Sequence, residues 1–376
     1  MIKRLGDICT FVGGGTPSKK NPDFYNGSIP WATVRDMNVR VIKTTEHSIT
    51  PDAVQQSATN IIPKGEVVIS THVGLGKVCF LGQDTAINQD LKAVIPNGEL
   101  SQRYLYYWFI SKADELIANG KGATVKGVTL DFVKNLKIHV LPEREQEVVS
   151  DTLDKVNHII ELADSQVARL DQLVKSRFVE MFGDPMTNPK GWRIGKVSDL
   201  AKYWNGLTYK PENVSETGTI VLRSSNIQGG RLDFADTVRV NISAKEKNVV
   251  VPGDVLMCSR NGSAALVGKT AIIPVTDERM YFGAFMMIIR STVPEYLNAY
   301  FSTKAFRSQI TCGATSTVNQ ITCTMMNRVS LPIPPMDLMR EFAAFVEKVD
   351  KLAFAARQRR DVAKQLYRAK IQEFFG

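Results

Sequence analysis

Apolar residues recur every seven positions along a long stretch in the middle of the chain, from about Glu143 to Phe182. Two positions of this heptad are apolar, and they are filled by Val149, Leu153, Val156, Ile160, Ala163, Val167, Leu170, Val174 and Met181. Charged residues fill most of the other positions. A repeat of this kind that continues for about five heptads is typical of a coiled-coil helix. The pattern therefore predicts one helix over residues 143–182 with an apolar seam along its length.

The end of the chain repeats this pattern. Residues 175–183 match residues 368–376, which is an offset of 368 − 175 = 193. The same offset predicts a second seam at Phe342, Val346, Val349, Ala353, Ala356, Ala363, Tyr367 and Phe374. Arg360 interrupts this seam and weakens it. We expect a second long helix, from about Met336 to Phe375, that pairs antiparallel with the first.

The regions before the two helices also resemble each other. In the first half, short strands are predicted within Ile29–Asp36, Ile61–Ser70, Val78–Leu81, Leu91–Ile95 and Leu136–Val140, with a helix from Tyr104 to about Ala118. In the second half, equivalent strands are predicted at Ile220–Asn226, Val251–Ser259 and Val329–Ile333. The fold class is therefore α/β (α+β). We expect two tandem domains, separated by the pair of long helices, in a pseudo-two-fold duplication.

Composition supports this organisation and narrows the function. At 376 residues the chain is long enough for two domains, and its net charge of +9 suits a polyanion such as nucleic acid. The five cysteines are an odd number without a Cys-x-x-Cys pair, so neither a disulfide framework nor a zinc site is expected. No signal peptide and no membrane-length apolar run are visible. We therefore expect a cytoplasmic protein without a membrane partner.

No sequence motif predicts catalysis by this chain. Gly262–Thr270 resembles a phosphate-binding loop, but five residues separate its glycines where the motif requires four, so we interpret it as a turn between strands. Asn21–Phe24 resembles the loop with which adenine methyltransferases hold an extruded base, but it lacks the second proline and is interpreted as a turn. The four histidines show no metal-ligand spacing. These absences favour a binding protein that holds no metal.

Polar side chains follow the buried strands at equivalent places in both halves. Arg, Asn, Gln, Ser and Thr read base edges, whereas Lys mainly contacts phosphates. The candidate DNA-binding residues of the first half are Arg35, Asn38, Thr71, His72, Lys77, Asn88, Gln89, Lys121 and Lys126. Those of the second half are Arg223, Ser224, Ser225, Asn226, Arg260, Asn261, Lys269, Asn319 and Gln320. Each residue alone is a weak candidate, and the recurrence in both halves is the stronger argument.

Three segments follow one another along the duplicated chain: Leu136–Gln146, Phe178–Pro185 and Asn188–Trp192. In this order they resemble the specificity subunits of type I restriction–modification systems. The resemblance implies target recognition domains at 1–142 and 184–335, joined by conserved helices at 143–183 and 336–376. It implies recognition of a bipartite site in double-stranded DNA. It also implies docking of two methyltransferase (modification) subunits, with two restriction subunits as further partners of the nuclease form. S-adenosylmethionine, ATP and Mg²⁺ would then be bound by partner subunits, and no cofactor by this chain.

Two other interpretations remain open at this stage. One is a self-sufficient DNA methyltransferase or nuclease, and the other is a coiled-coil scaffold that binds no DNA. The second helix also departs from the family pattern, because Pro335–Met339 replaces the Glu/Gln-rich start of the first. This departure argues against a fully symmetric helical pair more than it argues against membership of the family.

Overall fold

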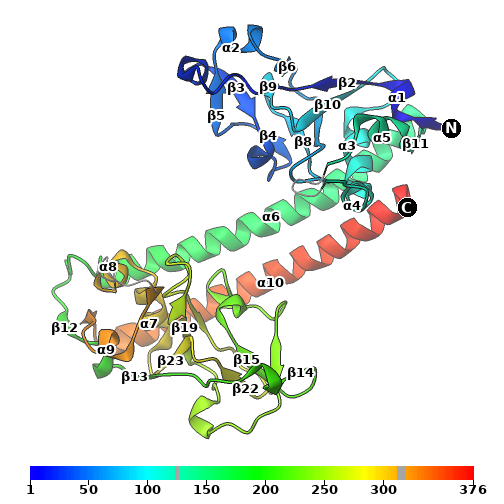
Figure 1. Ribbon diagram of the computed structural model, residues 1–376. Helices are drawn as coiled ribbons and strands as arrows, with labels where there is room; N and C mark the ends of the chain where they lie inside the picture. Colours follow the sequence, from blue (N-terminus) through cyan, green and yellow to red (C-terminus); the bar gives the residue numbers. More distant parts are fainter. Residues whose placement is uncertain (123–126, 311–318) are drawn as a thin grey trace. The chain divides into compact units, whose positions relative to one another are not determined.

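The computed structural model describes residues 1–122, 127–310 and 319–376. They form two compact units (Figure 1). Unit 1 comprises Met1–Asp164 and Arg357–Gly376, and unit 2 comprises Ser165–Ala356. The two long helices have the predicted bounds, α6 at Glu143–Phe182 and α10 at Met336–Phe375. Each of them contributes one segment to each unit.

Unit 1 contains short strands and helices before α6. Its strands are β1 (Ile2–Arg4), β2 (Cys9–Gly13), β3 (Ile29–Ala32), β4 (Val41–Ile42), β5 (His47–Ile49), β6 (Asn60–Ile62), β7 (Val67–Ser70), β8 (Val78–Leu81), β9 (Thr85–Ile87), β10 (Leu91–Pro96) and β11 (Lys137–His139). Its helices are α1 (Leu5–Ile8), η1 (Pro22–Tyr25), η2 (Val34–Asp36), α2 (Pro51–Gln55), α3 (Gln102–Ser111), α4 (Ala113–Ala118) and α5 (Leu130–Asn135).

Unit 2 repeats this succession before α10. Its strands are β12 (Arg193–Lys196), β13 (Ala201–Asn205), β14 (Val214–Ser215), β15 (Thr219–Leu222), β16 (Ile227–Gln228), β17 (Arg231–Leu232), β18 (Val238–Val240), β19 (Val255–Cys258), β20 (Arg260–Asn261), β21 (Thr270–Ile272), β22 (Met280–Phe282), β23 (Met286–Ser291), β24 (Asn319–Gln320) and β25 (Ser330–Ile333). Its helices are η3 (Val197–Asp199), η4 (Pro211–Asn213), η5 (Ser224–Asn226), η6 (Glu246–Asn248), α7 (Pro294–Phe301), α8 (Lys304–Gln309) and α9 (Cys323–Met326).

The two units have the same sheet topology, which confirms the duplication. The order β2-β10-β7-β8 in unit 1 corresponds to β13-β23-β19-β21 in unit 2, and these neighbours are antiparallel. A second sheet in each unit contains one parallel pair, β3 with β9 and β15 with β22. The units differ at the edges of their sheets. Strand β4 adds to β8 in unit 1, whereas the equivalent part of unit 2 forms the hairpin β16–β17. The second sheet includes β6 in unit 1 and β14 in unit 2, and unit 2 has a further pair, β20 with β24. Mainly antiparallel sheets with separate helices confirm the α+β class.

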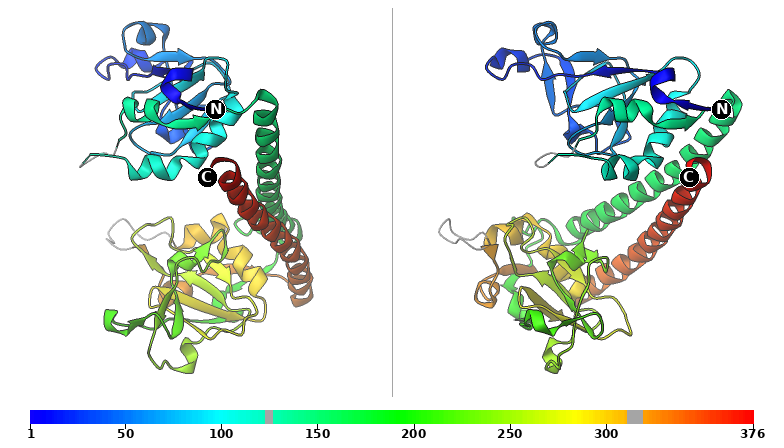
Figure 2. Two further views of the ribbon diagram at one scale, coloured as in Figure 1. Left: turned by 90° about the vertical axis from the view of Figure 1, so that its right-hand side faces the viewer. Right: turned by 45° about the vertical axis from the view of Figure 1, so that its right-hand side comes forward.

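In unit 1, α3 joins the five-stranded sheet to the long helices. Tyr104 and Tyr107 of α3 share one buried cluster with Val149 and Leu153 of α6 and with the sheet. The Phe375 ring near the end of α10 lies 5.2 Å from the ring of Tyr104. Tyr367, Ile371 and Phe374 of α10, the helix whose C-terminal end is marked C in Figure 2, also pack against this cluster. The helices are therefore held by contacts to the lobe, which is the part of each unit outside the two long helices, as well as by contacts to each other.

The helical segments in unit 2 pack in the same manner. Phe178 and Phe182 at the end of α6 lie 5.7 and 5.3 Å from Phe342 near the beginning of α10. Tyr296 of α7 completes this aromatic cluster, with ring centroids 5.6 Å from Phe178 and 4.9 Å from Phe182. Edge-to-face contacts of this kind stabilise a core beyond the area that they bury.

In each unit the end of one long helix packs against the beginning of the other, while antiparallel pairing along the whole length of the helices stays a prediction. The buried seam residues are Val149, Leu153, Val156, Ala163, Met181, Phe342, Val346, Val349, Ala353, Ala356 and Ala363. The other six are half-buried: Ile160, Val167, Leu170, Val174, Tyr367 and Phe374. Arg360, which interrupts the second seam, pairs at 3.3 Å with Asp164 of α6 and so remains part of the helix contact. Coiled-coil packing of side chains remains a prediction.

Local backbone signals account for the ends of the predicted elements. Gly183 has φ +80°, and its N–H donates to the carbonyl of Val179 at 2.8 Å, which is a left-handed termination of α6. One predicted helix is divided, because the helix expected from Tyr104 to Ala118 breaks at Lys112 into α3 and α4. The N–H of Lys112 is shared between the carbonyls of Trp108 and Phe109, which ends the first segment.

Leu153→Asp is expected to destabilise unit 1 by at least about 3 kcal/mol, because it places an unpaired charge where a fully buried side chain packs. Leu162→Asp on the same helix is the matched control. Because Leu162 is 55% exposed, this substitution should change the free energy of unfolding by no more than about 0.5 kcal/mol. Urea unfolding followed by circular dichroism measures both. Equal losses would show that the seam is misassigned.

Asp154 of α6 makes the stability of unit 1 dependent on pH. It accepts hydrogen bonds from Arg40, Arg103 and Tyr107 of the lobe. Burial raises the pKa of Asp154, but the hydrogen bonds from Tyr107 and Arg40 outweigh burial and hold this pKa below its ordinary value. A lowered carboxyl pKa stabilises the fold above the unfolded-state pKa of about 4, and this stabilisation is lost as the pH falls through the folded-state pKa.

Asp154→Asn is therefore expected to lower the unfolding free energy by about 2 kcal/mol at pH 7, with a smaller difference from wild type below pH 4. Chemical unfolding at several pH values measures this difference. Asp151→Asn is the control, because Asp151 contacts Arg103 at 2.6 Å but is more exposed. A difference for Asp154→Asn that stays constant from pH 7 to pH 3 would contradict the prediction.

Candidate nucleic-acid interface

In unit 2, polar side chains gather where β19 ends, beside the turn that precedes β23. The N–H groups of Ser259 and Arg260 donate to the carbonyl of Phe285 at 2.9 and 3.1 Å. The N–H of Ile321 donates to the carbonyl of Ser259 at 2.7 Å. Three backbone segments distant in sequence therefore meet at one place. The Arg260 guanidinium lies over the Phe285 ring, 5.1 Å from its centroid.

Unit 1 builds the equivalent place from different side chains. Ser70 and Cys258 occupy the same register position in their sheets, opposite Leu91 and Met286, so His72 corresponds to Arg260. The N–H of Thr71 donates to the carbonyl of Asp90 at 2.9 Å, and the N–H of Val128 to the carbonyl of Thr71 at 2.8 Å. His72 Nδ1 lies 3.9 Å from Asp90 Oδ1. One scaffold position therefore presents an imidazole and a carboxylate in unit 1, and a guanidinium and a phenyl ring in unit 2.

The loops after β3 and β15 form a second polar group in each unit. In unit 1, Arg35 is exposed and pairs with Glu46 at 3.4 Å. Asn38 Oδ1 accepts from Lys77 Nζ at 2.7 Å, so these two predicted residues are brought together. In unit 2, the Arg223 guanidinium donates to both carboxylate oxygens of Asp236 at 2.9 Å.

Three predicted base readers are buried and make structural contacts, and their role in DNA binding stays a prediction. Asn226 is fully buried, donates to the carbonyls of Asp233 and Asp236 and accepts from the Arg223 N–H. Asn88 is buried and bonds its neighbour Asp90. Thr71 is buried, and its hydroxyl contacts the Asp90 carbonyl at 3.2 Å.

Part of the recurrence between the halves has a structural cause. Asp36 accepts from the Thr33 N–H at 2.8 Å, and Asn226 accepts from the Arg223 N–H at 2.8 Å. Both side chains cap the first turn of a short 3₁₀ helix at equivalent places. A recurrent polar residue in such a turn satisfies free backbone N–H groups and needs no ligand.

The remaining candidates lie at or near the surface, where they make further local contacts. Asn261 donates to Ser224 Oγ at 3.1 Å, and Asn319 donates to the Gly262 carbonyl at 3.1 Å. Strand β24, which contains Asn319 and Gln320, pairs with β20 and so lies beside Arg260. Gln89 and Lys121 are exposed, and Ser225 is half-buried. Lys126 lies outside the described residues.

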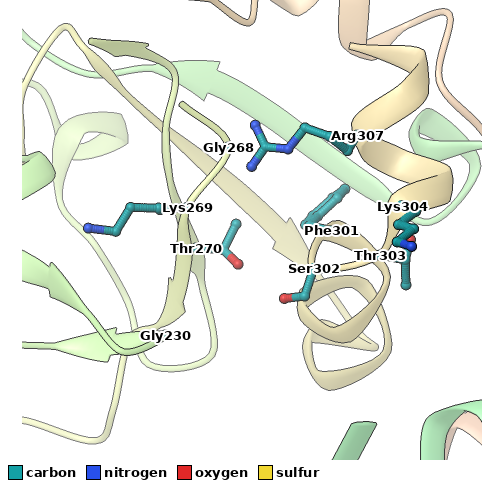
Figure 3. Close-up of a pocket in the computed structure, with 9 residues that line it drawn as sticks. All are labelled: Gly230, Gly268, Lys269, Thr270, Phe301, Ser302, Thr303, Lys304 and Arg307. Atoms are coloured by element: carbon teal, nitrogen blue, oxygen red, sulfur yellow. The ribbon is translucent and has the colours of Figure 1, made fainter. Parts of the chain in front are cut away.

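A hollow of ≈ 410 Å³ in unit 2 contains Lys269 in its wall. The other lining residues are Gly230, Gly268, Thr270, Phe301, Ser302, Thr303, Lys304 and Arg307. Figure 3 shows the hydroxyls of Thr270 and Ser302 facing the hollow from opposite sides, while the Lys269 ammonium extends away from its centre. Arg307 donates to the Val267 carbonyl at 2.5 Å. The lining residues include three cationic side chains and no carboxylate, so this region carries positive charge.

The two resemblances to catalytic loops are structural turns, as predicted. Gly268 has φ +82°, and Thr270 begins a strand, whereas a phosphate-binding loop leads into a helix. Asn21 caps the 3₁₀ helix η1, and Phe24 is buried. Within the described residues, no group of three or more His, Cys, Asp or Glu side chains is arranged to hold a metal ion. None of the described helices is long and apolar enough to cross a membrane.

Two residues of the candidate interface, Phe285 and Asp90, are not among those that the sequence predicts. Phe285 is 57% exposed although it lies in the most apolar run of the chain, and Asp90 faces His72. The sequence pattern predicts that an aromatic residue among consecutive apolar residues is buried in the core. Only the register of β23, in which Met286 begins the strand, identifies Phe285 as a turn residue.

Comparison with known proteins relates the chain to one family. The model of the type I restriction modification DNA specificity domain matches residues 1–172 and 189–364. The chain is 28% identical over 228 residues to the type I restriction enzyme MjaIX specificity subunit of Methanocaldococcus jannaschii, covering 54% of this chain and 52% of that one. It is 34% identical over 160 residues to the EcoR124I/EcoR124II specificity subunit of Escherichia coli, covering 41% and 40%. The matched regions thus span about half or less of these relatives.

Solved structures show the same fold. The S subunit of the type I restriction–modification system from M. genitalium has a TM-score of 0.59 at 12% identity, and the comparison covers 100% of this chain and 96% of that one. A chain from a structural study of the assembly and conformational transition of the type I R-M system has a TM-score of 0.54 at 19% identity, with coverages of 100% and 97%.

Proposed function

The chain belongs to the family defined by the type I restriction modification DNA specificity domain, and from this premise we propose that it is the DNA-recognition subunit of a type I restriction–modification complex. In this role each unit binds one half of a bipartite site in double-stranded DNA. The chain itself carries out no reaction.

The observation that carries this proposal is the difference between the two units at one scaffold position. The same backbone hydrogen bond holds this position in both units. The N–H of Val128 donates to the carbonyl of Thr71, and the N–H of Ile321 donates to the carbonyl of Ser259. The side chains presented there differ in charge and hydrogen bonding, His72 and Asp90 against Arg260 and Phe285. A duplicated scaffold with different reading side chains suits a site whose two halves have different sequences.

The long helices suit the docking of two modification subunits. Outside the seam, exposed apolar residues occur at matched positions, Ile159 with Leu352 (352 − 159 = 193) and Leu173 with Leu366 (366 − 173 = 193). Exposed apolar residues repeated at equivalent positions of two helices fit two copies of one partner better than two unrelated partners. Two restriction subunits would join the nuclease form of the complex.

The chemistry and its cofactors belong to the partners in this proposal. The modification subunits would bind S-adenosylmethionine and methylate adenine, and the restriction subunits would use ATP and Mg²⁺. Burial raises the pKa of the Cys9 and Cys79 thiols to about 12, so neither thiol is an activated nucleophile. With this role we place the protein in the cytoplasm.

Methylation mapping tests the proposal. The chain and its modification subunit, reconstituted and supplied with S-adenosylmethionine, are expected to methylate adenine only within one interrupted motif. Sequencing of the methylated DNA identifies that motif. Methylation without sequence preference would refute DNA recognition, and methyl transfer or cleavage by the chain alone would favour a self-sufficient enzyme.

Lys269→Ala is expected to weaken binding of the complex equally to all DNA sequences. It should also lower the slope of log affinity against log salt by about 1, because one phosphate contact is lost. Binding isotherms at several salt concentrations measure this slope. Lys64→Ala, at an exposed turn of unit 1, serves as the control. A change in sequence preference would identify Lys269 as a base reader, and binding that does not depend on salt would favour a scaffold without DNA.

A further inference from the structure

A second hollow in unit 2, of ≈ 340 Å³, lies against the end of β19 and the turn before β23. Arg260 and Phe285 line it together with Ser259, Asn205, Thr208 and Gln320. We infer that this hollow is a guanine-reading site, in which Arg260 binds the major-groove edge of the base and Phe285 positions the guanidinium. This inference rests on the proposed function, and it names the residues that carry recognition in one half-site.

The backbone holds the arginine and the ring next to each other. One carbonyl, that of Phe285, accepts from the N–H groups of both Ser259 and Arg260. The position of Arg260 is therefore tied to the turn that bears the ring. The guanidinium carbon lies over the ring, 5.1 Å from its centroid, so a cation–π contact holds the cation next to the ring.

Arg260 differs from two other arginines of unit 2 in that no carboxylate pairs with its guanidinium among the described residues. Arg223 donates to both oxygens of Asp236, and Arg290 donates to both oxygens of Asp254. In the part of the chain that the structure describes, no carboxylate pairs with Arg260. Its charge is instead supported by a phenyl ring that is itself more than half exposed.

The chemistry of the hollow suits a base edge better than a phosphate. Guanine presents two acceptors, O6 and N7, in the major groove, and they match the fork of one guanidinium. Arg260 is the single cation among the residues that line this hollow, and it is accompanied by an aromatic ring and the side-chain amides of Asn205 and Gln320. The hollow around Lys269 has three cations instead, which is the composition expected for a phosphate contact.

A buried hydroxyl provides a second, independent observation. Ser259 is 1% exposed, lines the hollow, and its Oγ has no hydrogen-bond partner among the described residues. The equivalent residue of unit 1, Thr71, bonds its hydroxyl to the Asp90 carbonyl. A buried hydroxyl without a partner is destabilising, and a ligand or a bridging water at this hollow would supply that partner.

The test compares variants of the whole chain in the reconstituted complex with its modification subunits. Arg260→Ala and Phe285→Ala are expected to lower methylation at the cognate motif between about fivefold and about 100-fold, the range of one bidentate base contact. Discrimination should be lost at one guanine of one half-site only. Phe285→Tyr keeps the ring and should retain the wild-type motif, whereas Phe285→Leu keeps apolar bulk without the ring and should behave like Phe285→Ala.

Three further variants complete the experiment. Arg260→Lys should lose the guanine preference, because a lysine cannot make the bidentate contact. His72→Ala should change the other half-site alone, which shows that the effects are local. Val275→Ala, at a residue 90% exposed in unit 2, controls for unspecific effects of substitution. Thermal unfolding and assembly with the modification subunit confirm that each variant is folded.

The outcomes separate this inference from the proposed function. If the wild-type complex has no motif, the proposed function fails and the inference fails with it. If the wild type reads a motif while Arg260→Ala and Phe285→Ala keep it unchanged, or lose activity equally on every sequence, only the guanine site is overturned. If Phe285→Leu matches wild type, the ring does not position the arginine.

Discussion

The stability of each unit depends on burying the apolar side chains of the long helices against each other and against the rest of the unit. The long helices are charged on most of their surface, and their apolar seam residues are buried only where the helices meet each other and the lobe. In unit 1 the lobe adds Arg40, Arg103 and Tyr107 around Asp154 of α6. In unit 2 Arg231 of β17 donates to Asp171 of α6 at 2.9 Å and to Asp350 of α10 at 2.7 Å. A lobe residue thereby bridges both helices.

These bridges lie close to the candidate reading loops. Arg40 follows the loop that contains Arg35 and Asn38, and Arg231 follows the loop that contains Arg223. A rigid attachment of such a loop to the helix keeps its side chains in a defined position, and recognition of base edges depends on that precision. The same arrangement recurs in both units, although the contacting residues differ in detail.

The division between scaffold and reading side chains follows from this architecture. Backbone hydrogen bonds at the ends of β7 and β19 are made whatever side chains are present, because they use only N–H and C=O groups. The side chains at these positions are therefore free to differ, as His72 and Arg260 do. Within one scaffold, a change of a few exposed residues can alter what is bound there with little cost in stability.

The sequence by itself determined the duplication, the bounds of both long helices and most of their seam, since these depend on periodic patterns that are local in the chain. It also separated turns from catalytic loops at Gly268 and Asn21. Only the tertiary structure decided which polar residues are available to a ligand. Asn226 and Thr71 are recurrent and polar, yet they satisfy buried backbone groups, while Phe285 is apolar and lies exposed beside Arg260. The reason is physical: burial and hydrogen-bond partners arise from segments distant in sequence, and no local pattern contains them.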